Sequence, residues 1–536
     1  MHAPLLLLPL LLQCAASSRP PNILFIVADD LGWNDISAHG SPQIPTPNLD
    51  ALFSGGATLN TYHAQPVCSP TRTSMLSGRH VIHTGIYMPF DSGVTNEALD
   101  PAYTLLPRYL KRAANYSTHL VGKWHLGANT RNATPVGRGF DSAYGYWSGA
   151  EDYETHSVTA AKRSVYDMQD DLAADVGANG TFSTAVFTAK AEAIIAAHAA
   201  AGPDAPPLFL YLAFQNVHWP LEAPPDIVAR FANATGGNHG RQMVCAMAAY
   251  LDEAVGNVTR ALAAAGMEGN TILIALSDNG GPTHNNEGTW SNNFPLRGGK
   301  NTLWEGGTRV LAAVKGPGIT PGTVVSAPVH ATDWLPSLVS MATGGADFRS
   351  FAPPGEPPYE EGDGLDVWAT ISGSAPPSPL QRDWLLLEAH NNGGGEGALT
   401  HGNGLIEWRP EGVLKYLLLG PEDPQVEDGW WAPDGQSAAA TPYSVQCSWQ
   451  GGGPRTGNAS VPTLCTGSTP CLFNLTADPC EYHDIAAQHP DLVAQMAARL
   501  AAYATVPPLV GKGCQPRIIT IQGTQGPASQ FQPCDV

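Results

Sequence analysis

The chain has 536 residues, 43% of them hydrophobic, and a formal net charge of −20. This length allows a large buried core and predicts one large domain with a smaller one beside it. The acidic balance argues against nucleic-acid binding, because a phosphate-binding surface needs an excess of lysine and arginine. Any anionic ligand would therefore be held by a few local cations.

The N-terminal segment predicts export. Leu5 to Leu12 form an apolar run that is too short to span a bilayer, and the small residues Ala15, Ala16 and Ser17 follow it. We interpret residues 1–17 as a signal peptide and expect no membrane span elsewhere. Seven Asn-x-Ser/Thr sequons fit passage through a glycosylating compartment: Asn115, Asn132, Asn179, Asn233, Asn257, Asn458 and Asn474. The expected location is the secretory pathway, with a lysosomal or extracellular destination.

The cysteines fit an oxidising compartment. Cys14 would leave with the signal peptide, and Cys245, in an Ala-rich helical stretch, is expected to be a buried thiol. Six others crowd the last quarter of the chain and are expected to form disulfides, with their pairing left open: Cys447, Cys465, Cys471, Cys480, Cys514 and Cys534.

Three apolar runs predict buried strands: Asn22 to Ala28, Leu208 to Phe214 and Thr271 to Leu276. Polar residues follow each run, and helical patterns lie between the runs. This alternation predicts a large α/β/α sandwich around a mostly parallel, mixed sheet, whose carboxyl ends form a crevice for a ligand. Polar side chains from distant segments are therefore expected to meet at one edge of the sheet.

Pro- and Gly-rich pieces begin near Phe351 and predict loops or linkers. We place the large domain at residues 18–382 and a smaller α+β domain at residues 383–536. The elements expected in the smaller domain are two strands, one helix and an irregular tail: Trp384 to Leu387, Leu414 to Leu419, Asp491 to Tyr503, and Gln522 to Val536.

Hard oxygen donors follow two of the predicted strands. Asp29 and Asp30 come directly after the first strand, and Asp278 and Asn279 come after the third. Carboxylate and amide oxygens suit Ca²⁺, or less readily Mg²⁺, whereas zinc would favour histidine or cysteine. Acidic residues at strand ends can also be solvated or cap the next helix, so one pair alone decides little.

A Cys-x-Pro-x-Arg run, made of Cys68, Pro70 and Arg72, opens a predicted helix and is the most informative motif in the chain. Taken alone, Cys68 could be a buried thiol or half of a disulfide.

Further cationic and imidazole side chains lie along the chain. Lys123 and His125 are two residues apart and would point to the same side of an extended segment. His218 follows the second predicted strand, and Lys300 lies in a Gly-rich loop. Taken alone, Lys123 and His125 fit a solvated face, and His218 fits a satisfied histidine at a sheet edge. Lys300, taken alone, fits an ordinary loop lysine.

In chain order these motifs resemble the type I sulfatases of the alkaline-phosphatase superfamily, most closely the arylsulfatase B or N-acetylgalactosamine-4-sulfatase group. The resemblance covers nearly all of the chain after the signal peptide. Besides the Cys68 motif, it rests on these segments: Ala28 to Asp35, Thr84-Gly85, Gly122 to Gly127, Gly139 to Tyr153, Asp278 to Gly281, Trp304 to Gly307, Asp333 to Pro336, and Leu472 to Leu475 with Asp478-Pro479.

The resemblance implies that a formylglycine-generating enzyme converts Cys68 to formylglycine, whose hydrate attacks sulfur with one hydroxyl. It implies one calcium ion, with these ligands: Asp29, Asp30, Asp278, Asn279 and the modified residue 68. Lys123, Lys300 and Arg72 would offset charge on the sulfuryl oxygens. His218 would protonate the leaving alcohol oxygen. His125 would accept a proton from the second hydroxyl, so that the aldehyde re-forms and sulfate is expelled.

The resemblance therefore predicts a sulfuric ester hydrolase of the arylsulfatase type. Its expected substrates are sulfated sugars or aryl sulfates, and an N-acetylgalactosamine 4-sulfate end is the finer suggestion. Two alternatives remain open on the same fold. One is a phosphodiesterase or phosphonate hydrolase, because phosphate and sulfate have similar tetrahedral shapes, and the other is a non-catalytic binder of sulfated glycans.

Overall fold

The computed structural model describes residues 19–90, 96–160, 162–284, 286–374, 382–389, 402–419, 429–430, 441–445, 447, 465, 469–503, 517–520 and 529–534. The predicted signal peptide lies outside these residues. Among the residues described, no helix combines the length and the apolar character needed to cross a membrane.

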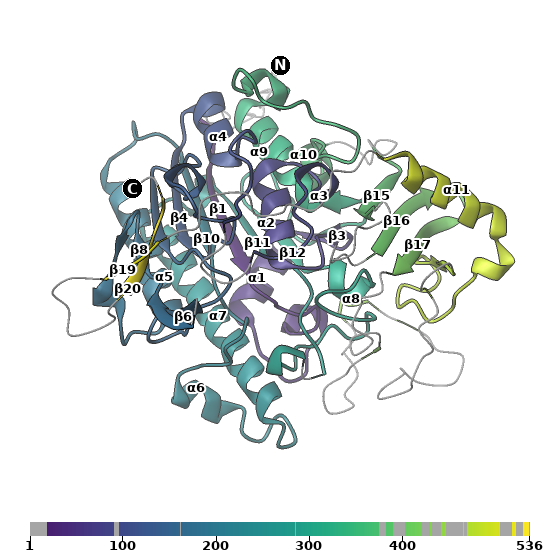
Figure 1. The fold of residues 1–536 in the computed structure, drawn as a ribbon, viewed down its shortest axis with the longest axis horizontal. Coiled ribbons are helices and arrows are strands. Elements are labelled where there is room, and N and C mark those ends of the chain that lie inside the picture. The colour runs from purple at the N-terminus through teal and green to yellow at the C-terminus, as the bar shows by residue number, and fades with distance from the viewer. Residues whose placement is uncertain are drawn as a thin grey trace, which may run out of the picture.

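A mixed sheet of ten strands forms the centre of the large domain (Figure 1). Its strands are β1 (Asn22–Ala28), β2 (Ala57–Leu59), β4 (Ser117–Gly122), β5 (Ser142–Gly145), β8 (Gln169–Asp170), β9 (Ala173–Ala174), β10 (Leu208–Ala213), β11 (Thr271–Ser277), β12 (Ala312–Lys315) and β13 (Thr323–Val325). Their order is β13-β2-β12-β11-β1-β10-β4-β5-β8-β9. The three predicted strands are β1, β10 and β11, which lie side by side and run parallel.

Helices cover both faces of the sheet because its central strands are apolar on both sides. In β1, Phe25 belongs to one hydrophobic core and Leu24 to the other. The first core contains residues of α2 (Cys68–Ser77), α4 (Leu106–Ala114), α9 (Trp334–Thr343) and α10 (Trp368–Ser372). The second contains residues of α1 (Pro47–Gly55), α5 (Ser183–Ala200), α6 (Pro225–Arg230) and α7 (His239–Ala264). The predicted α/β/α sandwich is confirmed.

A smaller, strand-rich domain follows. Its antiparallel sheet consists of β15 (Trp384–Glu388), β16 (Gly402–Arg409), β17 (Gly412–Leu419) and β18 (Cys471–Asn474), in that order. Met496 and Leu500 of α11 (Pro490–Ala502) pack against this sheet. The expected sheet covered by one helix is present, while the boundary at residue 383 stays a prediction.

The end of the chain corrects one expectation. Within the tail expected to be irregular, β20 (Ser529–Gln532) pairs with β19 (Arg517–Thr520) and runs parallel to β7 (Arg163–Tyr166), which pairs with β6 (Ser157–Ala160). Figure 1 shows β19 and β20 in yellow at the side of the molecule opposite α11. Phe531 is buried in the same core as Val165. One buried aromatic in a four-residue strand leaves too short a pattern to recognise in the sequence.

Disulfides are present in the smaller domain. Cys447 pairs with Cys480, and Cys465 pairs with Cys471. Cys534 is also disulfide-bonded, and Cys514 lies outside the described residues. Cys245 is a buried thiol in α7, as expected.

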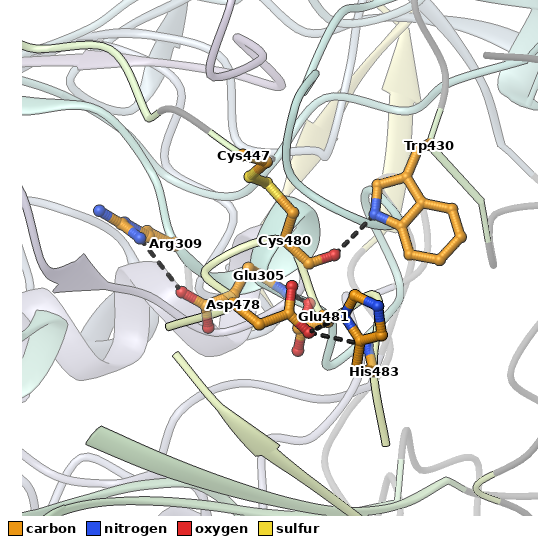
Figure 2. Close-up of a disulfide and its surroundings, with 8 residues drawn as sticks. All are labelled: Glu305, Arg309, Trp430, Cys447, Asp478, Cys480, Glu481 and His483. Atoms are coloured by element: carbon orange, nitrogen blue, oxygen red, sulfur yellow. Dashed lines mark hydrogen bonds and ion pairs between the residues drawn. A yellow bond between two sulfur atoms is a disulfide. The ribbon is translucent and has the colours of Figure 1, made fainter. Parts of the chain in front are cut away.

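Buried charges join the two domains. Glu305 begins α8 (Glu305–Thr308) in the large domain, and Nζ of Lys415 on β17 lies 2.9 Å from its Oε1. The same Nζ lies 2.8 Å from Oε1 of Glu481, whose other oxygen accepts from the Glu305 backbone N–H at 2.8 Å. Figure 2 shows Glu305 and Glu481 beside the Cys447–Cys480 disulfide. This cluster holds the smaller sheet against the start of α8.

Candidate active site

Four adjacent parallel strands bring the predicted site residues together. The sheet order β11-β1-β10-β4 places the carboxyl ends of these strands along one edge. Asp278 follows β11, Asp29 and Asp30 follow β1, and Lys123 follows β4. Gly122, with a φ of 103°, permits the close approach of β4 to β10, because a Cβ there would lie 1.9 Å from the Ala213 carbonyl oxygen.

Two buried carboxylates occupy the centre of this edge, and each contacts a lysine. Nζ of Lys123 donates to Oδ2 of Asp29 at 2.6 Å, and Nζ of Lys300 donates to Oδ2 of Asp30 at 2.9 Å. Asn279 donates through Nδ2 to Oδ1 of Asp30 at 2.7 Å. Burial opposes ionisation of Asp30, but Lys300, His218 and Lys123 outweigh it and lower the pKa of Asp30 to about 2. Asp30 is therefore charged, and the ammonium of Lys300 partly neutralises it.

Arg72 reaches the same edge from the first turns of α2. Its Nε and Nη2 donate to Oδ2 of Asp278 at 3.0 and 2.8 Å, and its Nη2 lies 3.7 Å from Oδ1 of Asp29. Burial and the Asp29 charge raise the pKa of Asp278 to about 6 despite this arginine. The arginine is thus held by two carboxylates of different strands.

Cys68 is the first residue of α2 and is buried as a thiol. Of the two fates left open by the sequence, a disulfide is therefore excluded. One possible ligand atom from each of Asp29, Asp30, Cys68 and His218 lies within 4.8 Å of the others. Burial raises the pKa of the Cys68 thiol above its ordinary value, although Lys123 and Lys300 oppose this.

The donors at this centre fit a hard cation. Oδ1 of Asp29 and Oδ1 of Asn279 are buried and accept no hydrogen bond, which is costly unless another group satisfies them. Both are oxygens of the kind that Ca²⁺ prefers. Asp278 is engaged differently, because Arg72 holds Oδ2 while Oδ1 accepts from the Asp30 backbone N–H at 3.3 Å.

His125 lies beside α2 in a conformation that the sequence did not predict. The backbone is not extended here, because β4 ends at Gly122 and His125 has a φ of 55°. Its Nε2 lies 2.9 Å from the Phe90 carbonyl oxygen, which can only accept, so Nε2 carries the proton. Its buried Nδ1 has no hydrogen-bond partner and keeps a lone pair. Gly149 packs on the ring, since a Cβ there would lie 2.8 Å from Cε1 and Nε2.

His218 lies on the solvent side of the cluster. Its Nδ1 lies 2.6 Å from the Trp219 carbonyl oxygen, which assigns the proton to Nδ1 and turns Nε2 toward Lys300 Nζ at 3.3 Å. Tyr153 donates to the His218 carbonyl oxygen at 3.0 Å and fixes the turn. Burial, together with the Lys300 charge, lowers the pKa of His218 to about 4.

The structure thus brings nine predicted residues together at this edge: Asp29, Asp30, Cys68, Arg72, Lys123, His218, Asp278, Asn279 and Lys300. His125 is connected to the site through Ser69, whose hydroxyl donates to the His125 carbonyl oxygen at 2.9 Å. Sequence reasoning missed several partners. Glu287, whose Oε2 lies 2.9 Å from Lys300 Nζ, belongs to a short loop without a recognisable motif. Phe90 contacts His125 through its backbone carbonyl oxygen, and Gly149 makes room for the His125 ring because it has no side chain. Neither contact leaves a pattern in a single sequence. Trp219 was detectable, because it directly follows His218.

A carboxylate-rich edge of an α/β sheet, surrounded by lysine, arginine and histidine, is suited to the hydrolysis of an anionic ester. The Sulfatase family model matches residues 21–345, and the chain belongs to this family. It is 35% identical over 500 residues to arylsulfatase J of Mus musculus, covering 91% of this chain and 76% of that protein. It is 30% identical to N-acetylgalactosamine-6-sulfatase of Rattus norvegicus, covering 69% of this chain and 70% of that protein.

Solved structures share the fold. The crystal structure of Ps i-CgsB in complex with k-i-k-neocarrahexaose has a TM-score of 0.69 at 22% identity and covers 91% of this chain and 94% of its own. A structure in complex with D-Glucosamine-2-N, 6-O-disulfate, described as its substrate, has a TM-score of 0.58 at 15% identity and covers 90% and 97%. The chain is accordingly a sulfuric ester hydrolase. These relatives do not single out arylsulfatase B, so that finer likeness stays a prediction.

Proposed function

We propose that the chain hydrolyses sulfate esters of sugars or aryl alcohols through a formylglycine derived from Cys68, next to one bound calcium ion. The observation that carries this proposal is the position of Cys68. It is a buried thiol at the start of a helix, and it shares one 4.8 Å cluster with two carboxylates that two lysines partly neutralise. A cysteine that served only to fill the core would not require two carboxylates and two lysines around it.

The calcium ligands proposed are the oxygens at the ends of β1 and β11: Asp29, Asp30, Asp278 and Asn279, with residue 68 as a further ligand. When bound, the ion supplies positive charge that polarises a sulfuryl oxygen. The aldehyde hydrate at position 68 supplies two hydroxyls on one carbon, one to attack sulfur and one to allow later elimination.

Three cationic side chains would complement the developing charge. Lys123 contacts Asp29, and Lys300 contacts Asp30. Arg72 contacts Asp278. All three are at most 4% exposed, so water screens them little and their charges are already in place. Such preorganised charge stabilises a transition state without reorganisation.

Two histidines would handle protons in different places. The unpartnered Nδ1 of His125 carries a lone pair that is available to accept a proton, and Ser69, the residue after Cys68, donates its hydroxyl to the His125 carbonyl oxygen at 2.9 Å. His218 is assigned the delivery of a proton to the leaving oxygen, since it is more exposed than Asp30 and Lys300 and its Nε2 contacts Lys300. Burial and the Lys300 charge lower the pKa of His218, whereas Asp30 and Glu287 favour the protonated ring, so the negative charge of the bound substrate must help to place that proton.

The substrate class proposed is a small or terminal sulfated sugar. Relatives are named N-acetylgalactosamine-6-sulfatase and arylsulfatase, and a structural neighbour holds a sulfated glucosamine. The net charge of −20 gives no long-range attraction for a polyanion. An N-acetylgalactosamine 4-sulfate end remains one candidate within this class.

Maturation in the secretory pathway fits the rest of the chain, with the lysosome or the cell exterior as the destination. Disulfides such as Cys447–Cys480 suit an oxidising compartment. Five sequon asparagines are exposed and available for glycans: Asn115, Asn132, Asn179, Asn233 and Asn257. Cys68 is only 1% exposed, so a formylglycine-generating enzyme would have to act before the domain folds.

The decisive experiment compares turnover of 4-nitrophenyl sulfate with that of bis(4-nitrophenyl) phosphate, using protein made in cells that contain the formylglycine-generating enzyme. We expect faster sulfate release, an aldehyde mass on the peptide that carries Cys68, and no turnover by Cys68→Ala. Faster phosphodiester cleavage would instead favour the phosphodiesterase alternative. An unmodified thiol with retained glycan binding and no turnover would favour the binder. Sulfate released from defined saccharides would then rank the sugars.

A further inference from the structure

An exposed tryptophan lies beside the candidate active site. Among the described residues, Trp219 and Val324 are the two large hydrophobic side chains that are exposed, and Trp219 is 54% exposed. Single exposed apolar residues are common, so exposure alone carries no argument. The position of Trp219 does carry one, because no residue separates it from His218.

Two segments place Trp219 at the solvent side of the site. Trp219 directly follows His218, whose imidazole contacts Lys300, and the Cα atoms of consecutive residues lie about 3.8 Å apart. From the other side, Cδ1 of Trp219 lies 4.0 Å from where a Cβ on Gly288 would be. Gly288 follows Glu287, whose carboxylate contacts Lys300 at 2.9 Å. The indole and this carboxylate therefore belong to the same small region.

Exposure rises steadily from the centre toward this region. The side chains of Asp30 and Lys300 are 0% and 4% exposed, that of His218 is 12% exposed, and that of Glu287 is 33% exposed. The alcohol portion of a sulfate ester bound at the buried centre would therefore extend in the direction of rising exposure, past His218 toward Trp219 and Glu287.

We infer that Trp219 and Glu287 form a leaving-group subsite that accepts an uncharged ring and disfavours an alcohol with a second anionic group next to the ester. This inference rests on the proposed function, because it concerns the alcohol that the enzyme releases. The flat indole offers apolar contact area to the face of a sugar or aryl ring, with little conformational entropy to lose. The carboxylate of Glu287 repels a neighbouring carboxylate or second sulfate.

The contacts around Glu287 explain why its charge would still act on a ligand. Lys300 is shared, since its Nζ is also 2.9 Å from Oδ2 of Asp30. One ammonium thus faces two carboxylates and cannot neutralise both. The turn that carries Trp219 is meanwhile held by the Tyr153 hydroxyl and by the Nδ1 contact of His218. The subsite therefore combines an indole carried on a fixed turn with a partly exposed negative charge.

The first test uses turnover of two aryl sulfates with similar leaving groups, 4-nitrophenyl sulfate and its 3-carboxylated analogue. The wild type should prefer the uncharged substrate in kcat/KM by about tenfold. Because Glu287 also contacts Lys300, its substitution affects both rates, so the readout is their ratio. Glu287→Gln should raise the ratio of kcat/KM for the carboxylated substrate to that for the uncharged substrate several-fold. Glu268→Gln is the matched control, because Glu268 is 63% exposed and precedes β11 at the edge of the sheet opposite Asp278. An equal effect of Glu287→Gln on both substrates would overturn the assignment of Glu287.

The second test measures binding without turnover, in the Cys68→Ala background, by calorimetry with phenyl sulfate and with inorganic sulfate. Trp219→Ala should weaken phenyl sulfate binding by about tenfold and leave inorganic sulfate unchanged, because sulfate alone does not reach the indole. Val324→Ala is the control for loss of an exposed hydrophobic side chain. Equal binding of phenyl sulfate with and without Trp219, in an enzyme that releases sulfate, would reject the subsite alone. If the Cys68→Ala protein that retains Trp219 binds neither ligand, both the subsite and the proposed function are rejected.

Discussion

Arg72 and Asp278 are 206 positions apart in the sequence and form a fully buried ion pair, with two N–H groups of the arginine donating to one carboxylate oxygen. The pair ties the first turns of α2, which carry Cys68, to the end of β11. The position of the cysteine relative to the carboxylates therefore depends on a contact between two segments that are far apart in the sequence.

Removing the arginine should strongly destabilise the fold. Arg72→Met leaves Asp278 buried without its partner, which typically costs about 3–5 kcal/mol of unfolding free energy. The loss should be measured by urea unfolding at pH 7.5. Arg349→Met is the control, because Arg349 is 55% exposed in its pair with Asp347 and should cost less than about 1 kcal/mol. Equal losses for the two variants would mean that the buried pair contributes nothing beyond a surface contact.

The sequence predicted the site well where the local pattern and the fold agree. Uninterrupted apolar runs defined β1, β10 and β11, and in a parallel sheet their carboxyl ends must share an edge, which fixed the place of Asp29 and Asp278. It failed where tertiary contacts set the backbone. His125 takes a positive φ where its N–H donates to the Trp147 carbonyl oxygen at 3.2 Å. The contact between Glu287 and Lys300 joins two loops and depends on neither segment alone.

The buried carboxyl group of Asp167 should make stability depend on pH. Burial raises the pKa of Asp167 from 3.8 to about 7, although Ser148 donates its backbone N–H to Oδ2 at 2.9 Å. The folded state therefore prefers the protonated acid. Its contribution to stability is complete below pH 3.8 and is lost as the pH rises to about 7.

Asp167→Asn removes this titrating group and should make the unfolding free energy less dependent on pH. Between pH 5 and 7 the unfolding free energy of the wild type should fall by about 2 kcal/mol relative to that of the variant. Urea unfolding at several pH values measures the difference, and taking a difference removes the other titrating groups. Asp170→Asn removes a carboxylate that is 52% exposed and should leave the shape of the curve unchanged. Parallel curves for the wild type and Asp167→Asn would contradict the raised pKa.

A single methyl group should disturb His125 without touching the charged centre. In Gly149→Ala the new Cβ would lie 2.8 Å from the imidazole, so the ring must move away from its place beside α2. We expect kcat on 4-nitrophenyl sulfate to fall by about tenfold or more, since small misplacements of a proton acceptor are costly. Gly269→Ala is the control, because its Cβ would meet nothing within 4 Å. A variant with normal kcat and a normal melting temperature would show that His125 does not need this position.

Removal of calcium should be visible in stability even without an activity assay. The two buried oxygens without hydrogen bonds, Oδ1 of Asp29 and Oδ1 of Asn279, would lose their compensation in the metal-free protein. A cation that binds only the folded state stabilises it by about 2.7 kcal/mol at one hundred times its dissociation constant. Dialysis against a chelator should therefore lower the melting temperature, and Ca²⁺ should restore it better than Mg²⁺ at equal concentration.

The residues responsible can be separated by the size of this shift. Asn279→Ala removes an oxygen from the site and should shrink the calcium-dependent rise in melting temperature, whereas Asp170→Asn, at an exposed position, should retain it in full. Since Asn279 also donates to Oδ1 of Asp30, both variants are compared in the metal-free state first, so that the lost hydrogen bond is measured apart from the lost ligand. Identical melting temperatures of the wild type with calcium and with chelator would remove calcium from the proposed mechanism. The buried oxygens of Asp29 and Asn279 would then need water or a different cation as their partner.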